Sequence, residues 1–284
     1  MARSRPSERA PVAAERLLQV ARQELAQARD ELTGPGGAFE IAHVNVNGIP
    51  VRAYRHALPD VRALWQSTAA FAERTYLVYG DERLTYRQAH ARVDAIAAWL
   101  AAQGIRPGDR VAMVMPQRFE TAVAYMAVLQ MGAVAMPLSM LFGPEALAFR
   151  INDSQTRVAV CDESTVQALQ LARQDCPALQ TLIGVGAAGA QSDLDYAKAT
   201  ATMAATFQPI KTWAEDPAVL IYTSGTTGLP KGCMHTHGTI MHNAMSSGLW
   251  ANGTPENKCL CVVPMFHITG MVSVMHATIF MGAT

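Results

Sequence analysis

Apolar residues recur at helical spacing near the start of the chain. Within residues 13–32 they follow one another at steps of three and four. This spacing predicts a helix with one apolar stripe, and the Gly-Pro-Gly-Gly run at 34–37 ends it. We expect residues 1–37 to form a helical N-terminal extension that packs on the main domain or on a partner chain. The stripe consists of Ala14, Leu18, Ala21, Leu25, Ala28 and Leu32.

Beyond residue 40 the chain alternates short apolar runs with amphipathic stretches. Thr85 and Gln88 have the spacing of a capping box, which marks the start of a helix over 86–100. Short apolar strands separated by helices are typical of a parallel sheet covered on both faces. Strands are predicted at 111–115, 134–136, 157–161 and 179–185, and further helices at 119–131, from 144 and at 164–174.

Small and polar residues fill the stretch 186–212, which predicts a loop between two α/β subdomains. After it, strands are expected at 218–222 and 258–263, each followed by a helix. The predicted fold class is therefore α/β, with two mainly parallel sheets flanked by helices and with the second sheet incomplete. The predicted domains are the extension 1–37, a first α/β subdomain 38–190 and a second, truncated subdomain 191–284.

Composition excludes several classes of protein. Half of the residues are hydrophobic and 16% are charged, unlike a disordered chain. Lys plus Arg equals Asp plus Glu at 23 each, so no overall field favours nucleic acid. No transmembrane segment is expected, because Gln130, Gly132 and Pro137 divide the uncharged stretch 121–144. Five cysteines without a CxxC pair indicate reduced thiols, no metal site and a cytoplasmic protein.

One short segment carries candidate chemistry. Residues 222–232 read Tyr-Thr-Ser-Gly-Thr-Thr-Gly-Leu-Pro-Lys-Gly and follow the apolar run 218–221. Glycines let the backbone approach an anion, hydroxyl groups donate hydrogen bonds, and lysine adds positive charge. A strand, this turn and a following helix would make a phosphate-binding loop; a flexible surface loop is the alternative. The expected binding residues are Thr223, Ser224, Gly225, Thr226, Thr227, Gly228 and Lys231.

This string resembles the phosphate loop of the adenylate-forming (AMP-binding) superfamily, which includes acyl-CoA synthetases and fatty-acid–CoA ligases. It differs from a Walker A loop, because Pro230 precedes the lysine and Gly232 follows it. The segments 235–237 (His-Thr-His) and 264–270 (Pro-Met-Phe-His-Ile-Thr-Gly) are similar to the motifs that come next in that superfamily. The resemblance begins near residue 60 and covers only the N-terminal portion of such enzymes.

The resemblance implies an ATP-dependent ligase that activates a carboxylic acid, for example in fatty acid metabolism. The loop would hold the β- and γ-phosphates of ATP, with Lys231 and Mg²⁺ stabilising negative charge. The acid would attack the α-phosphorus, pyrophosphate would leave, and the acyl-AMP would pass its acyl group to coenzyme A. By the same resemblance, His267 is the catalytic candidate beside the carboxylate, with a core histidine as the alternative. His237 is assigned a capping or packing role.

Members of the superfamily are considerably longer than this chain. We therefore expect a truncated, weakly active or inactive portion of a ligase. Adenylation for a carrier protein and a non-catalytic nucleotide- or acyl-binding fragment remain alternatives, and pyrophosphate release would exclude the latter. The expected partners are an organic acid, ATP and CoA, and a homo-oligomer is left open.

Overall fold

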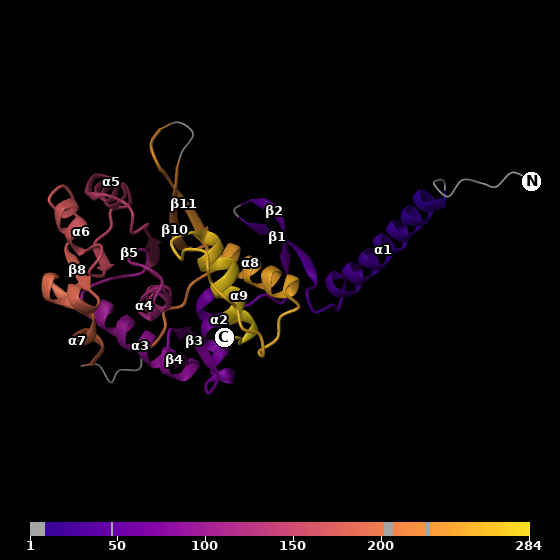
Figure 1. Cartoon of the computed structure of the whole chain (residues 1–284), viewed down its shortest axis with the longest axis horizontal. Helices are drawn as coiled ribbons and strands as arrows, with labels where there is room; N and C mark the ends of the chain where they lie inside the picture. The colour runs from indigo at the N-terminus through magenta and orange to yellow at the C-terminus, as the bar shows by residue number, and fades with distance from the viewer. Residues whose placement is uncertain (1–8, 47, 202–206, 225–227) are drawn as a thin grey trace, which may run out of the picture. The chain divides into compact units, whose positions relative to one another are not determined.

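The chain is described by a computed structural model that covers residues 9–46, 48–201, 207–224 and 228–284 (Figure 1). It contains two compact units, residues 1–57 and 58–284. The sequence instead predicts divisions after residues 37 and 190, and that subdivision stays a prediction.

The first unit contains a long helix and a hairpin. Helix α1 spans Arg9–Thr33, which confirms the helix predicted from the apolar stripe. Strands β1 (Ile41–Val46) and β2 (Ile49–Tyr54) pair in antiparallel fashion with Val46 opposite Ile49.

The second unit is built around a seven-stranded sheet with the order β11-β10-β6-β5-β7-β8-β9 (Figure 1). All neighbouring pairs are parallel except β10 and β11, which are antiparallel at one edge. The predicted α/β class with mainly parallel strands is therefore confirmed. The strands are β5 (Arg110–Val114), β6 (Val134–Pro137), β7 (Val158–Cys161), β8 (Thr181–Gly184), β9 (Leu194–Asp195), β10 (Pro217–Thr223) and β11 (Lys231–Thr236).

Helices cover both faces of this sheet, because successive strand residues point to opposite sides. Val111 and Met113 of β5 belong to the core beneath α3 (Tyr86–Ala102) and α4 (Phe119–Gln130). Ala112 and Val114 belong to the core beneath α5 (Pro144–Ser154) and α6 (Val166–Arg173). The strands thus read as continuous apolar runs because they are buried on both sides.

Helix α3 begins as its sequence predicts. The Thr85 hydroxyl accepts the backbone N–H of Gln88, and the Gln88 side chain accepts the N–H of Thr85, at 3.2 and 2.9 Å. This reciprocal pair satisfies two backbone donors that the first helical turn leaves unpaired. The helix follows a hairpin of β3 (Thr75–Tyr79) and β4 (Glu82–Thr85).

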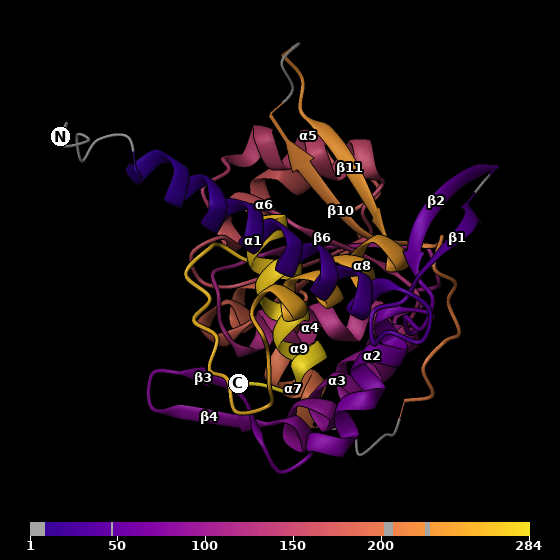
Figure 2. The same cartoon turned by 90° about the vertical axis from the view of Figure 1, so that its right-hand side faces the viewer.

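The remaining elements are short, apart from α8. Two helical segments, α2 (Val61–Ser67) and η1 (Thr68–Phe71), open the unit, and α8 (His237–Trp250) follows β11. Near the end, the π-helix η3 (Thr269–His276) runs into α9 (Ala277–Met281). Figure 2 shows α9 and α8 in neighbouring positions, in agreement with their contacts. No helix among the residues that the structure describes is long and apolar enough to span a bilayer.

Two expectations about the sheet and the loop beside it are wrong. The strand expected at 218–222 does not start a second sheet; it is β10, which pairs with β6 and so extends the first one. The expected loop 186–212 contains η2 (Gly186–Gln191), β9 and α7 (Tyr196–Ala201), and β9 pairs with β8.

Residues 258–263 form no strand, although their sequence predicts one. A strand needs a neighbour to accept and donate backbone hydrogen bonds along its length. Here the backbone pairs only near Cys259, whose N–H donates to Thr284 at 2.8 Å, among the hydrogen bonds of the described chain. The carbonyls of Cys261 and Val263 accept instead from a side chain, described below.

Candidate nucleotide and acid site

The candidate phosphate loop connects the two strands of a hairpin. Thr223, at the end of β10, is the cross-strand partner of Lys231, at the start of β11. The expected helix directly after the loop is therefore wrong, and α8 begins six residues later, at His237. Gly232 fits the hairpin because a Cβ there would lie 2.9 Å from a Leu220 methyl carbon.

Of the binding residues predicted from the sequence, Thr223, Ser224, Gly228 and Lys231 are described, and they lie at the loop end of this hairpin. Thr223, Ser224 and Lys231 are exposed, so their polar groups are accessible to a ligand. Gly228 has φ +103, a conformation that residues with a side chain rarely adopt, and a Cβ there would meet no atom within 4 Å. The backbone conformation at this position, rather than close packing, therefore requires a glycine. Gly225, Thr226 and Thr227 lie outside the described residues.

Next to its loop, the hairpin is held by a polar contact between residues that lie far apart in the sequence. The Tyr222 hydroxyl donates to the Asp153 carboxylate at 2.5 Å. The guanidinium of Arg150 lies 3.9 Å from the centre of the Phe142 ring and 5.7 Å from that of Tyr222. Burial and the Asp153 carboxylate raise the pKa of Tyr222, so the phenol stays protonated as the donor. These contacts join the hairpin to α5 (Figure 2).

The hairpin tip and the segment that leads to His267 lie at the same edge of the sheet. Since β10 is parallel to β6 and β6 to β5, their carboxyl ends face the same way. The chain leaves β5 towards α4 on one face and leaves β6 towards α5 on the other. Adjacent strands whose connections diverge in this way leave a crevice, the usual ligand site in open α/β sheets.

A small cavity occupies this place in the structure. Its volume is about 220 Å³, and it lies between the segments after β5 and β6 and the segment 264–266. Its walls are almost wholly apolar, with a glutamine amide among them. The lining residues are Met115, Pro116, Gln117, Met140, Leu141, Pro264, Met265 and Phe266.

His267 follows this wall directly. Its side chain is exposed, and its Nδ1 accepts the Thr269 N–H at 3.2 Å. The ring proton must then lie on Nε2, which is available to donate. Among the described residues, no hydrogen bond joins His267 to the hairpin. The structure thus places the two predicted features at one edge of the sheet without direct contact.

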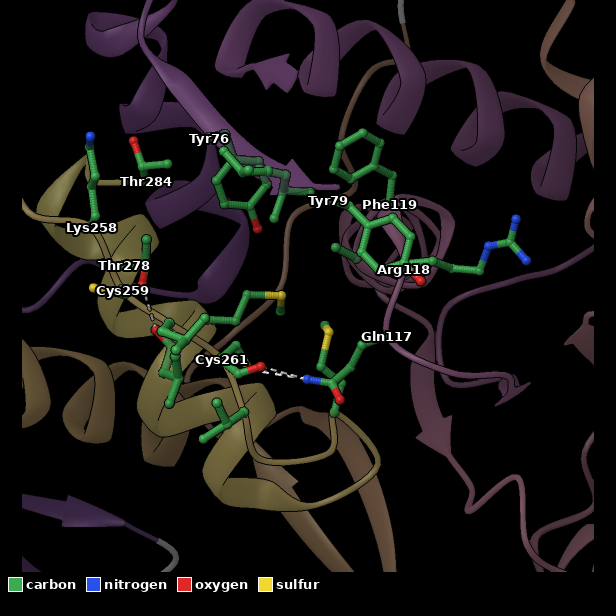
Figure 3. A pocket seen from close by; sticks show the side chains of 18 of the residues that line it. Tyr76, Tyr79, Gln117, Arg118, Phe119, Lys258, Cys259, Cys261, Thr278 and Thr284 are labelled. Atoms are coloured by element: carbon green, nitrogen blue, oxygen red, sulfur yellow. Dashed lines mark hydrogen bonds between the residues drawn. The ribbon is translucent and has the colours of Figure 1, made fainter. Parts of the chain in front are cut away.

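Gln117 holds the segment before His267 in place. Its Nε2 donates to the carbonyl of Cys261 at 3.0 Å (Figure 3). The same nitrogen donates to the carbonyl of Val263 at 3.1 Å. The same residue lines a larger apolar cavity of about 800 Å³, whose other walls come from β3, the start of α4, the segment 258–262, η3 and α9. Tyr76, Tyr79 and Phe119 face this cavity in Figure 3. Both cavities share Pro116, Gln117 and Met265.

His237 packs and does not reach the site. It is fully buried, and its Nδ1 accepts the N–H of Val61 at 3.4 Å, at the first turn of α2. Burial lowers its pKa, although the carboxylates of Asp60 and Asp216 act in the opposite direction. A neutral imidazole is required to accept this hydrogen bond, in keeping with the expected packing role.

Comparison with known proteins identifies the class to which this arrangement belongs. The family model described as "AMP-binding enzyme" matches residues 64–284. The chain belongs to this family of adenylate-forming enzymes.

Particular relatives agree with this assignment. An acetyl-coenzyme A synthetase of Novosphingobium aromaticivorans is 33% identical over 224 residues, which cover 71% of this chain and 33% of that protein. A long-chain-fatty-acid–CoA ligase, FadD13 of Mycobacterium tuberculosis, is 31% identical over 198 residues, covering 69% and 38%. The inhibitor-bound N-terminal domain of FACL13 from the same organism superposes with a TM-score of 0.70 at 28% identity, covering 80% of this chain and 56% of that one. The chain spans about a third of the length of the first curated relatives it matches.

Proposed function

We propose that this chain binds ATP at the tip of the β10–β11 hairpin and serves the activation of a carboxylic acid to an acyl adenylate. The observation that carries the proposal is the position of the hairpin. Its exposed Lys231 is opposite Thr223 at the carboxyl edge of the sheet, where the crevice beside Pro264 also opens. The names of the relatives support coenzyme A as the acceptor of the acyl group.

Each residue has a defined role in this proposal. Lys231 binds phosphate oxygens by charge-assisted hydrogen bonds, which are stronger than neutral ones. The hydroxyls of Thr223 and Ser224 add donors, and Gly228 allows the loop its backbone conformation. His267 donates from Nε2 to the acid carboxylate and so orients it towards the α-phosphorus.

Magnesium is the usual companion of ATP, and it is commonly bound by phosphates with one or two carboxylates. In the described part of the chain, no three His, Cys, Asp or Glu residues are placed to hold a metal ion. The proposal accordingly assigns no metal ligand to this chain. The five cysteines are all free thiols, which supports a cytoplasmic location.

The test is the affinity of the chain for MgATP, measured by calorimetry. Lys231→Ala should raise the dissociation constant by roughly ten- to a hundredfold, because a charge-assisted hydrogen bond contributes about 1.5–3 kcal/mol. Gly228→Val should weaken binding at least as much, since valine disfavours the required φ. Lys211→Ala is the matched control, because that ammonium lies 4.2 Å from the Trp213 ring centre, before β10. Unchanged affinity in Lys231→Ala would refute the assignment, provided that melting temperatures show all variants folded.

Pyrophosphate exchange separates activation from binding alone. Exchange that depends on an added organic acid supports adenylate formation by this chain. ATP binding without exchange favours the alternative, a nucleotide-binding portion that does not turn over. Whether coenzyme A or a carrier protein accepts the acyl group is decided by which of the two forms a thioester.

A further inference from the structure

Helix α1 carries an apolar stripe with a stricter period than the core-facing helices require. Six exposed residues alternate between leucine and alanine along Arg9–Thr33. Steps of three and four in strict alternation repeat every seven residues, which is the pattern of a two-helix seam. In heptad notation, Leu18, Leu25 and Leu32 take position a, and Ala14, Ala21 and Ala28 take position d.

These leucines are exposed in the structure. Leu18, Leu25 and Leu32 are 59%, 70% and 38% exposed, and Leu17 beside them is 71% exposed. A helix with such a stripe is normally stabilised by burying it against a partner. The stripe therefore marks a docking face, and the charges beside it indicate the partner.

The flanking charges fit a second copy of the same helix. Positions e are Glu15, Arg22 and Arg29, and positions g include Glu24 and Glu31. In a parallel pair, position g of one helix meets position e of the next heptad of the other, so Glu24 faces Arg29 of the second copy, twice by symmetry. An antiparallel pair centred on this seam also forms two attractive pairs, between Glu15 and Arg29, but it sets Glu24 against its own copy and Arg22 against its own copy. The charges thus favour the parallel arrangement.

The ion pair that Arg29 makes within α1 does not prevent it from pairing with Glu24 of a second copy. Arg29 pairs with its neighbour Asp30 at 2.7 Å, and both side chains are about two-thirds exposed. Exposed pairs of this kind contribute little, so Arg29 can take a new partner on association.

We propose that α1 is a dimerisation helix: two copies of this chain associate through a parallel coiled coil along Leu18, Leu25 and Leu32. Alanine at position d limits the apolar area of each layer, and three heptads are few. We therefore expect a reversible dimer whose fraction depends on protein concentration.

Sedimentation velocity of the full chain tests the seam. The wild type should shift from monomer to dimer with rising concentration, whereas Leu18→Asp/Leu25→Asp should raise the dimer dissociation constant at least tenfold. The matched control is Gln19→Asp/Ala26→Asp, which adds the same charges at the same spacing one residue further round the helix and should leave the dimer intact. A wild type that stays monomeric, as it would if α1 packs on its own chain, overturns the proposal, as does a control as disruptive as the seam variant.

Charge reversal and crosslinking test the orientation. Glu24→Arg and Arg29→Glu should each weaken the dimer several-fold, and the double reversal should restore it. In the parallel register both copies of residue 18 share a layer, so Leu18→Cys should form a disulfide-linked dimer on oxidation, beyond any linkage that the native cysteines give. Gln23→Cys, on the outer face, should not. Failure of the double reversal to restore the dimer, or equal crosslinking by both cysteine variants, contradicts the parallel seam.

Discussion

One buried histidine, His276, makes the stability of the fold depend on pH. It is fully buried in the π-helix η3, where its Nδ1 donates to the Met271 carbonyl at 3.0 Å. Its Nε2 lies 3.4 Å from the Tyr125 hydroxyl, which can donate to it. Burial lowers the pKa of His276 to about 4, so the folded protein holds a neutral imidazole.

We predict that His276 makes the fold sensitive to mild acid. Its pKa is near 6.5 in the unfolded chain and about 4 when folded, so the unfolded state binds the proton first. The contribution to stability is complete above pH 6.5 and declines as pH falls towards 4, by about 2 kcal/mol between pH 7.5 and 5. Urea unfolding at both pH values should show a smaller difference for His276→Gln than for the wild type.

The control for this experiment is His267→Gln, which alters an exposed histidine and should keep the wild-type pH dependence. A remaining dependence in His276→Gln is expected, because burial also lowers the pKa of His237. An identical pH dependence in His276→Gln and the wild type would contradict the prediction.

At the same scale, some residues of the candidate site can be predicted from the sequence and others cannot. Lys231 and Gly228 stand in a local string whose chemistry is readable without a structure. The contacts of Gln117, and of Tyr222 with Asp153, cannot be predicted from the sequence. The partners lie far apart along the chain, and no sequence spacing indicates that they meet. Gln117 reaches carbonyls 144 and 146 residues away, and Tyr222 reaches a carboxylate 69 residues away.

Helices and strands were predictable where local pattern decides the structure. The buried strands β5 to β8 and the start of α3 follow from apolar runs and a capping box. Strand β11 was not predictable, because Lys231–Thr236 is largely exposed and its apolar and polar residues do not clearly alternate. Its identity depends on pairing with β10. The segment 258–263 shows the reverse case, in which a strand-like sequence lacks the paired neighbour that would make it a strand.

The capping box allows a prediction for one element. Thr85→Ala should lower the free energy of unfolding by about 1 kcal/mol, since it leaves the Gln88 N–H without its acceptor. For a unit of this size the melting temperature should fall by roughly 2–4 °C. Differential scanning calorimetry would measure the shift.

Arg87→Ala serves as the control, because Arg87 stands in the same helical turn. Its ion pair with Glu73 is exposed on both sides and contributes little. If Thr85→Ala melted at the same temperature as Arg87→Ala, the cap would have no measurable effect on stability.

For the whole molecule, the hydrophobic cores lie in one compact unit. Among the residues that the structure describes, the core clusters begin at Val61 and include no residue of the first unit. Sequence patterning predicted the class of fold but placed two strands in a separate sheet. Which strands pair is a long-range property, because Val219 of β10 pairs with Ala135 of β6, far back along the chain.

We predict that a chain beginning at Leu58 keeps the cooperative melting transition of the full protein, to within a few degrees. The physical reason is that its cores remain complete when residues 1–57 are removed. Thermal denaturation followed by circular dichroism would measure both chains. Loss of the transition, or a fall of more than ten degrees, would show that the first unit is required for folding.

The pairing of Thr223 with Lys231 has a consequence for how the chain tolerates changes in length. A residue inserted between these two positions lengthens a loop whose ends stay paired, at a cost of a fraction of a kcal/mol. A residue inserted within β11 turns every later side chain of that strand to the opposite face. Under the proposed function, length changes in the loop would abolish phosphate binding while the protein still folds, whereas length changes within β11 would damage the sheet itself. Selection for solubility alone would therefore admit insertions in the loop that selection for ligand binding would reject.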